Sequence, residues 1–248
     1  PSTKTYTAQV VLGYIVSLYF ACNLAESASE KKRIKEELKK LLNLVKLIDD
    51  SFAAIEENSN FRQITKEALK YNSWYVLRDG SSNSVCADEI RIKYSENCYQ
   101  SVTSITVSEA LRLGINESFL MLISEEKLSV LATTIITLIA QRNILVLISI
   151  DGGSSKELQE LIDSDLLYIV EMPPADKYYS FIPTILAGQF ISYFQAIELD
   201  KRIQYFSNLK NSLDDKDRLL EAVHQFGIAL KAGYFNQGYS VSDLSHLH

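Results

Sequence analysis

The sequence predicts an α/β protein built on a doubly wound parallel sheet with helices on both faces. Two observations indicate this fold. From about residue 73 to residue 172, short and nearly continuous apolar runs alternate with segments of helical periodicity. Strands that are apolar along their whole length are typical of parallel sheets, which are buried on both faces. No segment rich in proline, glycine or serine divides this region, so we expect it to form a single sheet.

Composition and charge narrow the class of protein. The chain has 248 residues, 47% of them apolar and 23% charged, so it can bury a full core. A net charge of −6 opposes binding to nucleic acid and to anionic membranes. The three cysteines and three histidines do not have the spacing of zinc ligands or of a disulfide framework. We therefore expect no metal, no cofactor and a reducing, cytoplasmic environment.

The first 70 residues have helical periodicity. Thr5–Leu24 carries no charge, but polar residues interrupt it and no signal-peptide features precede it, so we expect a helix buried on all sides rather than a membrane span. Ser29–Asp49 places an apolar stripe opposite lysines and glutamates, and the Ser27–Ser29 region can cap its start. Phe61–Tyr71 is a third predicted helix.

Strands and helices then alternate, which is the order that a parallel sheet requires. The first predicted strand is followed by a helix that ends near Asn97. Pro173 and Pro174 stop the last strand, because proline has no backbone N–H to donate. The predicted strands are Trp74–Leu77, Ser101–Val107, Phe119–Ile123, Ile144–Ile150 and Leu167–Glu171, and the further helices are Ser108–Leu113, Ser124–Ala140, Ser155–Ile162, Phe181–Glu198 and Leu219–Ala232.

The loop at residues 78–83, Arg-Asp-Gly-Ser-Ser-Asn, directly follows the first strand. In open parallel sheets, ligands bind at the carboxyl ends of strands, near the N-termini of the following helices. Gly80 allows a close backbone approach, and the hydroxyls of Ser81 and Ser82 can donate to anionic oxygens. The loop is neither a Walker loop nor a dinucleotide fingerprint. It indicates a phosphate site, with an ordinary capped turn as the alternative.

The helix after this loop has three charged residues on one face. Glu89 and Lys93 are four residues apart, and Glu96 lies seven residues beyond Glu89. A carboxylate beside an ammonium suits proton transfer between adjacent sugar carbons, because the base takes the proton and the cation favours its ionised form. From the spacing alone, a solvated helix face is the alternative interpretation.

Three segments resemble the isomerase (SIS) domain of the glucosamine-6-phosphate synthase family. Residues 1–9 resemble the Ser-Thr-Lys-x-(Tyr/Phe)-Thr-x-Gln segment that closes the first of two tandem SIS subdomains. Ala87–Arg112 resembles the second subdomain's Glu-x-x-x-Lys-x-x-Glu helix and its later Gly-Glu-x-x-His-Gly-Pro segment. The similarity covers about residues 1–213. Its C-terminal part matches at Gln189, Tyr193, Ala196, Asn208, Leu209 and Ser212.

The resemblance implies three parts of the chain and a homodimer. Residues 1–72 would be helices that complete a preceding SIS subdomain and link it to the second. Residues 73–213 would form that second subdomain, and residues 214–248 a helical extension that covers a neighbour or a dimer partner. Because the chain starts at Pro1, and the phosphate loops of a first subdomain are missing before it, we expect a fragment or a processed product.

The resemblance also implies roles for individual residues. Glu96 would be the base that moves a proton between C1 and C2 of a phosphorylated ketose such as fructose-6-phosphate, and Lys93 would assist it. The residues expected to contact the sugar phosphate are Ser2, Thr3, Gly80, Ser81, Ser82, Glu89, Glu109, Arg112 and Lys210.

Two positions depart from the family's catalytic pattern. Arg112 stands where the family has a ring-opening histidine, and arginine does not release its proton near neutral pH. Asn211 stands where the family has an imine-forming lysine, although Lys210 is adjacent. The sequence also contains no cysteine-nucleophile domain for glutamine hydrolysis. Three functions stay open: an isomerase or aminotransferase, a ketosamine-phosphate deglycase, and a phosphosugar-binding regulatory module without catalysis.

Overall fold

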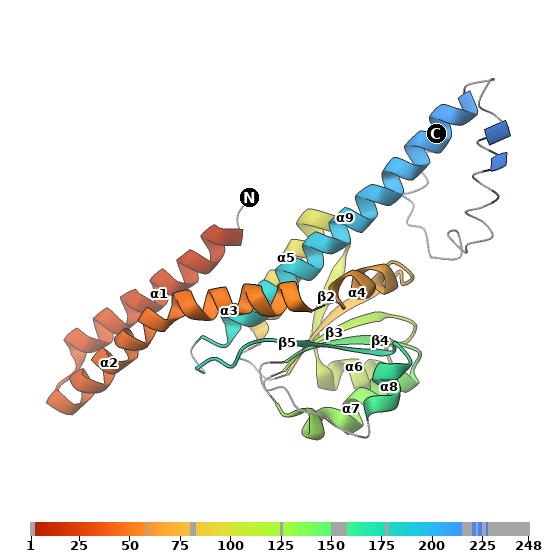
Figure 1. Cartoon of the computed structure of the whole chain (residues 1–248). Helices are drawn as coiled ribbons and strands as arrows, with labels where there is room; N and C mark the ends of the chain where they lie inside the picture. The colour runs from red at the N-terminus through yellow and green to blue at the C-terminus, as the bar shows by residue number, and fades with distance from the viewer. Residues whose placement is uncertain are drawn as a thin grey trace.

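The computed structural model has an α/β core from which long helices extend in two directions (Figure 1). It describes residues 3–58, 60–79, 83–124, 126–149, 158–176 and 179–214, and five positions between 220 and 227. Of residues 3–7, and of several residues between 202 and 214, it describes the backbone alone. The predicted helix Leu219–Ala232 and the rest of the predicted extension therefore lie almost entirely outside the described residues.

Five parallel strands form one sheet in the order β2-β1-β3-β4-β5. In this register Trp74 of β1 is paired with Val102 on one side and with Phe119 on the other. The doubly wound parallel sheet is confirmed, and each predicted strand boundary agrees within one residue. The strands are β1 (Trp74–Arg78), β2 (Val102–Thr106), β3 (Phe119–Ser124), β4 (Ile144–Ser149) and β5 (Leu167–Glu171).

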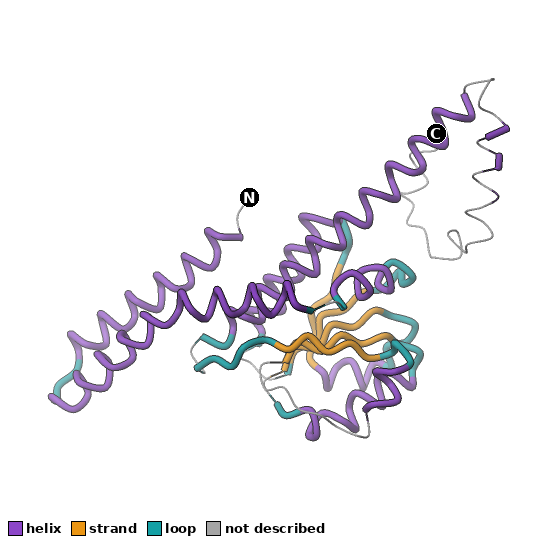
Figure 2. Tube along the Cα trace, in the orientation of Figure 1, coloured by secondary structure: helices purple, strands orange, loops and turns teal. Residues whose placement is uncertain are grey.

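Helices cover both faces of the sheet, as predicted (Figure 2). Successive residues of a strand point to opposite faces, so Val76 and Leu77 of β1 enter two different apolar cores. The first core is closed by α4 (Phe61–Ala68), α5 (Ser84–Cys98) and α9 (Phe181–Asp214). The second is closed by α6 (Val107–Leu113), α7 (Leu128–Ala140) and α8 (Gln159–Asp163).

Several helix boundaries differ from the prediction: the helices expected to end at Asp49 and Tyr71 end at Glu57 and Ala68. α7 begins at Leu128 rather than Ser124, because Ser124 is the last residue of β3 and is paired with Ser149 of β4. α9 continues to Asp214, well beyond the predicted end at Glu198. Its last turns extend past the sheet (Figure 1), and Leu199, Ile203, Phe206 and Leu213 continue a helical spacing of apolar residues there in the sequence.

The predicted helix Ser29–Asp49 is two helices with a short 3₁₀ turn, Leu41–Asn43, between them. α2 (Ala28–Lys40) starts at Ser27, which forms a capping box with Glu30 and confirms the predicted cap. α2 buries a single residue, whereas α3 (Leu44–Glu57) packs on α9. The turn therefore lies where the chain passes from a projecting hairpin to the core.

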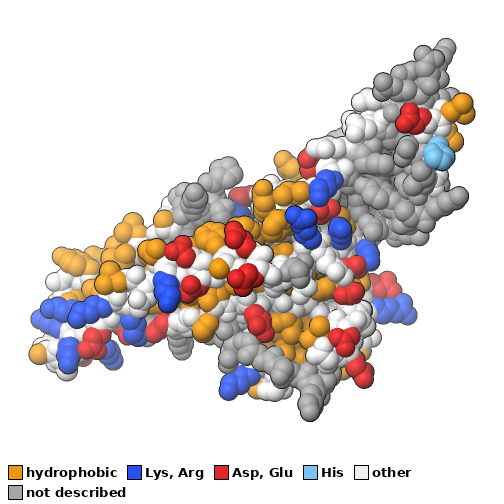
Figure 3. All heavy atoms as spheres, viewed as in Figure 1, with side chains coloured by type: hydrophobic (Ala, Val, Ile, Leu, Met, Phe, Trp, Pro, Cys, Tyr) orange, Lys and Arg blue, Asp and Glu red, His pale blue; other side chains and the backbone are white. Residues whose placement is uncertain are grey.

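The expectation that Thr5–Leu24 is buried on all sides is wrong. The helix exists as α1 (Thr3–Leu24), but it packs along one side against α2. Hydrophobic side chains gather along this projecting hairpin (Figure 3). The most exposed of them on α1 are Leu12 (58%), Tyr19 (64%), Phe20 (59%) and Leu24 (78%). An uncharged helix is suited to burial, and Val11 and Tyr14 do pack against the first core, but the residues named above stay open to solvent. None of the described helices is long and apolar enough to cross a membrane.

Candidate functional site

Glu89 and Lys93 are the only charged side chains that are buried in the part of the chain that the structure describes. Both lie on α5, where Glu89 is 4% and Lys93 3% exposed. Lysine and glutamate are almost never buried to this degree unless they are paired. Lys93 Nζ lies 2.6 Å from Glu96 Oε2 and 3.7 Å from Glu89 Oε1. The predicted cluster is therefore brought together.

Glu96 differs from its two neighbours because its side chain is 51% exposed. The three residues lie at helical spacings of three and four, so they share one side of α5. The buried ammonium of Lys93 lies beneath the carboxylate of Glu96 and donates a hydrogen bond to it. The arrangement presents a carboxylate to solvent with a fixed cation behind it, which is a suitable geometry for a base.

The long helix α9 packs closely against this part of α5. A β-carbon on Gly188 would lie 2.3 Å from the side chain of Ile90, so only glycine permits this approach. The next residue, Gln189, is buried, and its Nε2 donates to Glu89 Oε1 at 3.2 Å. Gln189 thus joins the cluster from a position 100 residues away in the sequence, where the family resemblance marked it but the spacing on α5 did not.

A second polar cluster lies at the carboxyl edge of the sheet. β2 and β3 follow β1 in the sequence but lie on opposite sides of it, so the strand order reverses between β1 and β3. Ligands of open α/β sheets bind at such a switch point. There, Ser124 Oγ donates to Asp79 Oδ2 at 3.0 Å, and the buried Asn83 donates to the Asp79 carbonyl oxygen at 2.9 Å. Asp79 and Asn83 both belong to the predicted phosphate loop.

Glu109 has a structural role at the start of α6. Its carboxylate accepts hydrogen bonds from the backbone N–H and the hydroxyl of Thr106, at 2.8 and 2.7 Å, and so completes a capping box. These two bonds, aided by the charges of Arg78 and Arg112, lower the pKa of Glu109. Arg112 lies in the last turn of the same short helix and is exposed.

The predicted site residues fall into two groups that one small ligand does not span. α5 runs from the carboxyl edge back to the amino edge, because it connects two parallel strands. At a helical rise of 1.5 Å per residue, about 20 Å separates Asn83 from Glu96. Glu109 and Arg112 are near the loop, whereas Glu89 and Lys93 are near Glu96. Ser2, Gly80, Ser81 and Ser82 lie outside the described residues, as do the side chains of Thr3 and Lys210.

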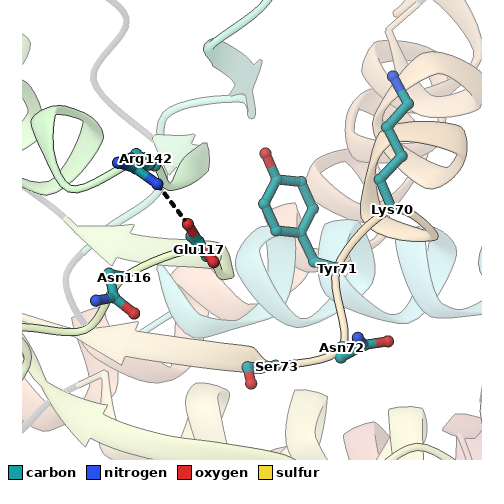
Figure 4. A pocket seen from close by; sticks show the side chains of 7 residues that line it. All are labelled: Lys70, Tyr71, Asn72, Ser73, Asn116, Glu117 and Arg142. Carbon is teal, nitrogen blue, oxygen red and sulfur yellow. Dashed lines mark hydrogen bonds and ion pairs between the residues drawn. The ribbon is translucent and has the colours of Figure 1, made fainter. Parts of the chain in front are cut away.

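A hollow of about 570 Å³ lies at the opposite, amino edge of the sheet (Figure 4). The ring of Tyr71 stands between Lys70 and an ion pair in which Arg142 Nη1 is 2.8 Å from Glu117 Oε1. The two side chains of that pair are 80% and 65% exposed, and an exposed pair contributes little. We assign this hollow no catalytic role, because none of the residues that line it belongs to the predicted site. Its remaining lining residues are Asn72, Ser73 and Asn116.

Among the described residues, no group of three or more histidine, cysteine or acidic side chains could hold a metal ion. The three cysteines, all of them described, form no disulfide bond. Burial raises the pKa of Cys98 to about 12, although its thiol donates to the Ser192 carbonyl oxygen at 3.4 Å. A thiol of this kind is inert at neutral pH, so Cys98 is not a candidate nucleophile. The candidate for chemistry is then the charged cluster on α5.

The sheet order and the two cores define a doubly wound α/β protein. Its fold is that of a sugar isomerase (SIS) domain, as the sequence resemblance implied. The structure is similar to the C-terminal domain of glucosamine-fructose-6-phosphate aminotransferase from Francisella tularensis, with a TM-score of 0.57 and 18% identity. That match covers 79% of this chain and 54% of the Francisella domain, so the chain spans about half of its length.

Two further similarities are weaker. A putative sugar-phosphate isomerase from Listeria monocytogenes matches with a TM-score of 0.47 and 15% identity, over 66% of this chain and 90% of that one. Tagatose-6-phosphate ketose/aldose isomerase from Escherichia coli matches with a TM-score of 0.45 and 12% identity, over 67% of this chain and 50% of that one. No protein-family model and no curated protein sequence matches the chain.

Proposed function

We propose that the chain binds a phosphorylated ketose or ketosamine and that Glu96 transfers a proton between C1 and C2 of the sugar. The observation that supports this most is the buried Lys93 ammonium held 2.6 Å from the half-exposed Glu96 carboxylate. In such a transfer Glu96 takes the C1 or C2 proton, an enediol-type intermediate forms, and the same carboxyl returns the proton to the neighbouring carbon.

The energetic cost of this arrangement supports a functional role. Taking a lysine and a glutamate out of water costs several kcal/mol per ion, and a well-packed apolar pair in their place is often at least as stable. The fold of α5 therefore does not require an ion pair at these two positions. Buried charged groups next to an exposed partner are a recurrent feature of active sites.

The alternative is a phosphosugar-binding module without catalysis, and a specific observation favours it. Asp79, Asn83 and Ser124 form a polar cluster at the switch point, about 20 Å from Glu96 along α5. A sugar phosphate held there does not reach the proposed base. Arg112 and Asn211 at the family's histidine and lysine positions agree with this alternative.

The two functions predict different responses to two substitutions. The protein is screened by thermal shift with hexose and hexosamine phosphates, and the ligands that bind are tested for turnover. If Glu96 is the base, Glu96→Gln abolishes turnover and changes the dissociation constant by only a few fold. The matched control Glu117→Gln, on the exposed pair at the amino edge, retains turnover. Turnover that survives Glu96→Gln shows that another group is the base.

Asp79→Ala distinguishes binding at the switch point from binding at the charged cluster on α5. In the alternative function, Asp79→Ala abolishes ligand binding, Glu96→Gln leaves it intact, and no tested sugar phosphate is turned over. In the catalytic function, turnover depends on Glu96. Among reactions of this type, transfer of an amino group to fructose-6-phosphate, aldose–ketose isomerisation and ketosamine-phosphate deglycation are distinguished by the products of the turnover assay.

We further propose a homodimer in the cytoplasm. The exposed face of α1 has no charge between Thr5 and Leu24, so two copies of it can pack together without like-charge repulsion. Cys22, Cys86 and Cys98 form no disulfide bond, which agrees with a reducing compartment. We also propose that the chain has three parts, formed by residues 1–72, 73–213 and 214–248.

A further inference from the structure

We infer that Gln189 is a positioning residue that keeps the Lys93 ammonium on Glu96 by occupying the competing carboxylate, Glu89. This inference rests on the proposed function of Glu96. Gln189 touches neither Glu96 nor, in the proposed reaction, the sugar carbons. It acts through the buried pair, and its effect is to decide which of two carboxylates Lys93 approaches more closely.

The distances around Lys93 support this competition. Glu89 Oε1 faces two donors: Gln189 Nε2 at 3.2 Å and Lys93 Nζ at 3.7 Å. The amide is within hydrogen-bond distance of that oxygen, whereas the ammonium is beyond it. On its other side Lys93 Nζ is 2.6 Å from Glu96 Oε2, a short charge-assisted hydrogen bond. Lys93 is thus closer to the exposed carboxylate than to the buried one.

The orientation of the Gln189 amide is fixed by Glu89. With the amide turned over, its carbonyl oxygen would face a carboxylate oxygen, and two acceptors repel each other. In the observed orientation Gln189 Oε1 is buried and has no hydrogen-bond partner among the described residues. In this orientation the amide leaves its own oxygen without a hydrogen bond while its nitrogen donates to Glu89. An unsatisfied buried acceptor is unfavourable, and the bond donated to Glu89 outweighs that cost in this orientation.

Close packing of α9 on α5 holds Gln189 at this distance. Gly188, next to it, allows the two helices to approach until the Ile90 side chain fills the space of a missing β-carbon. Neither Gln189 nor Glu89 is more than 6% exposed, so water does not readily replace the amide if it is removed. The buried Glu89 carboxylate would then gain its missing hydrogen bond from the nearest cation, which is Lys93.

The test replaces the amide with an apolar side chain of the same length. Gln189→Met removes the donor and nearly preserves the volume. In a crystal structure of this variant we expect Lys93 Nζ to move within hydrogen-bond distance of Glu89 and away from Glu96. With a sugar phosphate that the wild type turns over, we expect kcat to fall about tenfold or more and KM to stay within about twofold.

Gln195→Met is the matched control. Gln195 lies on the same helix and is fully buried, but neither atom of its amide has a partner among the described residues. Its replacement alters the packing of α9 without touching Glu89, so we expect kcat and the Lys93–Glu96 distance to be unchanged. In the double variant Glu89→Gln/Gln189→Met the competing carboxylate is absent, and we expect Lys93 to stay on Glu96.

The outcomes separate this inference from the proposed function. An unchanged Lys93–Glu96 distance in Gln189→Met overturns the positioning role, whatever the activity. A wild type that turns over no sugar phosphate refutes the proposed catalysis, while the crystal structures still decide the role of Gln189. If Gln189→Met does not fold, Gln189→Asn, whose amide is one methylene too short to reach Glu89, is measured in the same way.

Discussion

Gly188 of α9 and Ile90 of α5 lie so close that a β-carbon on Gly188 would be 2.3 Å from the Cγ1 and Cδ1 atoms of Ile90. Real β-carbons do not make such contacts with a packed side chain. The two helices can meet at this distance only because residue 188 is glycine. The same approach places Gln189 within 3.2 Å of Glu89, so the packing of two helices and the geometry of the buried charges depend on one missing methyl group.

Gly188→Ala is expected to lower the free energy of unfolding by about 1–3 kcal/mol, because the new methyl group overlaps Ile90 in a packed core. Denaturant unfolding measures this change. The control is Gly13→Ala in α1, where a β-carbon would meet nothing within 4 Å. That substitution should stabilise the protein by up to about 1 kcal/mol, since alanine is the better helix former. Equal effects at the two positions would contradict the close packing of α5 and α9.

Much of the fold could be predicted from the sequence because the composition of each strand reflects how it is buried. β3 and β4 are apolar without interruption, which is what burial on both faces requires, and their predicted boundaries agree within one residue. The break at Leu41–Asn43 could not be predicted in this way. It contains no proline or glycine, and α3, which follows it, packs on α9, an element far away in the sequence.

The candidate site could be predicted only in part. The spacing of Glu89, Lys93 and Glu96 predicts a shared helix face, but it does not reveal that two of the three are buried. Burial depends on α9, which supplies Gln189 from 100 residues away. The apolar character of α1 indicates that the helix is suited to burial, but not which surface covers it. Such pairings arise from tertiary structure, and a local pattern contains no information about them.

Asn143→Ala is expected to cost about 2–3 kcal/mol of stability, because Asn143 is 1% exposed and joins three backbone groups. Its Oδ1 accepts from the Ser118 N–H at 3.0 Å, and its Nδ2 donates to the carbonyl oxygens of Ile115 and Leu138, both at 2.8 Å. Thermal unfolding measures the loss. The exposed Asn116 is the matched control, and Asn116→Ala should change stability by no more than about 0.5 kcal/mol. A loss of the same size at Asn116 would contradict this role of Asn143.

Thiol labelling should distinguish the three cysteines. Cys86 and Cys98 are buried, and burial raises the pKa of Cys98 to about 12, so neither should react with iodoacetamide at pH 8 in the native protein. Cys22 on α1 is partly exposed and should be alkylated. Mass spectrometry of the native protein should therefore find a single labelled thiol, and Cys22→Ser should find none. Native labelling of Cys98 would show that α9 does not cover α5 as described.

Glu109 should contribute a pH-dependent part of stability. Hydrogen bonds from the backbone and side chain of Thr106 lower its pKa in the folded state below the ordinary value of 4.5. A lowered pKa means that the stabilisation is fully present above 4.5 and is lost as the pH falls through the folded-state value. Glu109→Gln keeps a capping side chain without the charge. The melting temperature of the wild type should exceed that of the variant at pH 7, and the difference should shrink below pH 4.5. A constant difference across this range would exclude the effect.

Charged substitutions on α1 should dissociate the proposed homodimer without unfolding the monomer. Val16 and Phe20 are 43% and 59% exposed, so Val16→Lys/Phe20→Lys removes little packing within a single chain. Full burial of one such side chain is worth about 1.5–3 kcal/mol, and two lysines facing their symmetry copies would add repulsion. Sedimentation equilibrium should find a dimer for the wild type and a monomer for this variant, with similar melting temperatures when both are measured as monomers.

Glu36→Lys, on an exposed polar position of α2, is the control and should remain dimeric. A dimer that survives the α1 substitutions would mean that another surface joins the two copies, whereas a monomeric wild type would mean that the apolar face of α1 is covered by something other than a second copy.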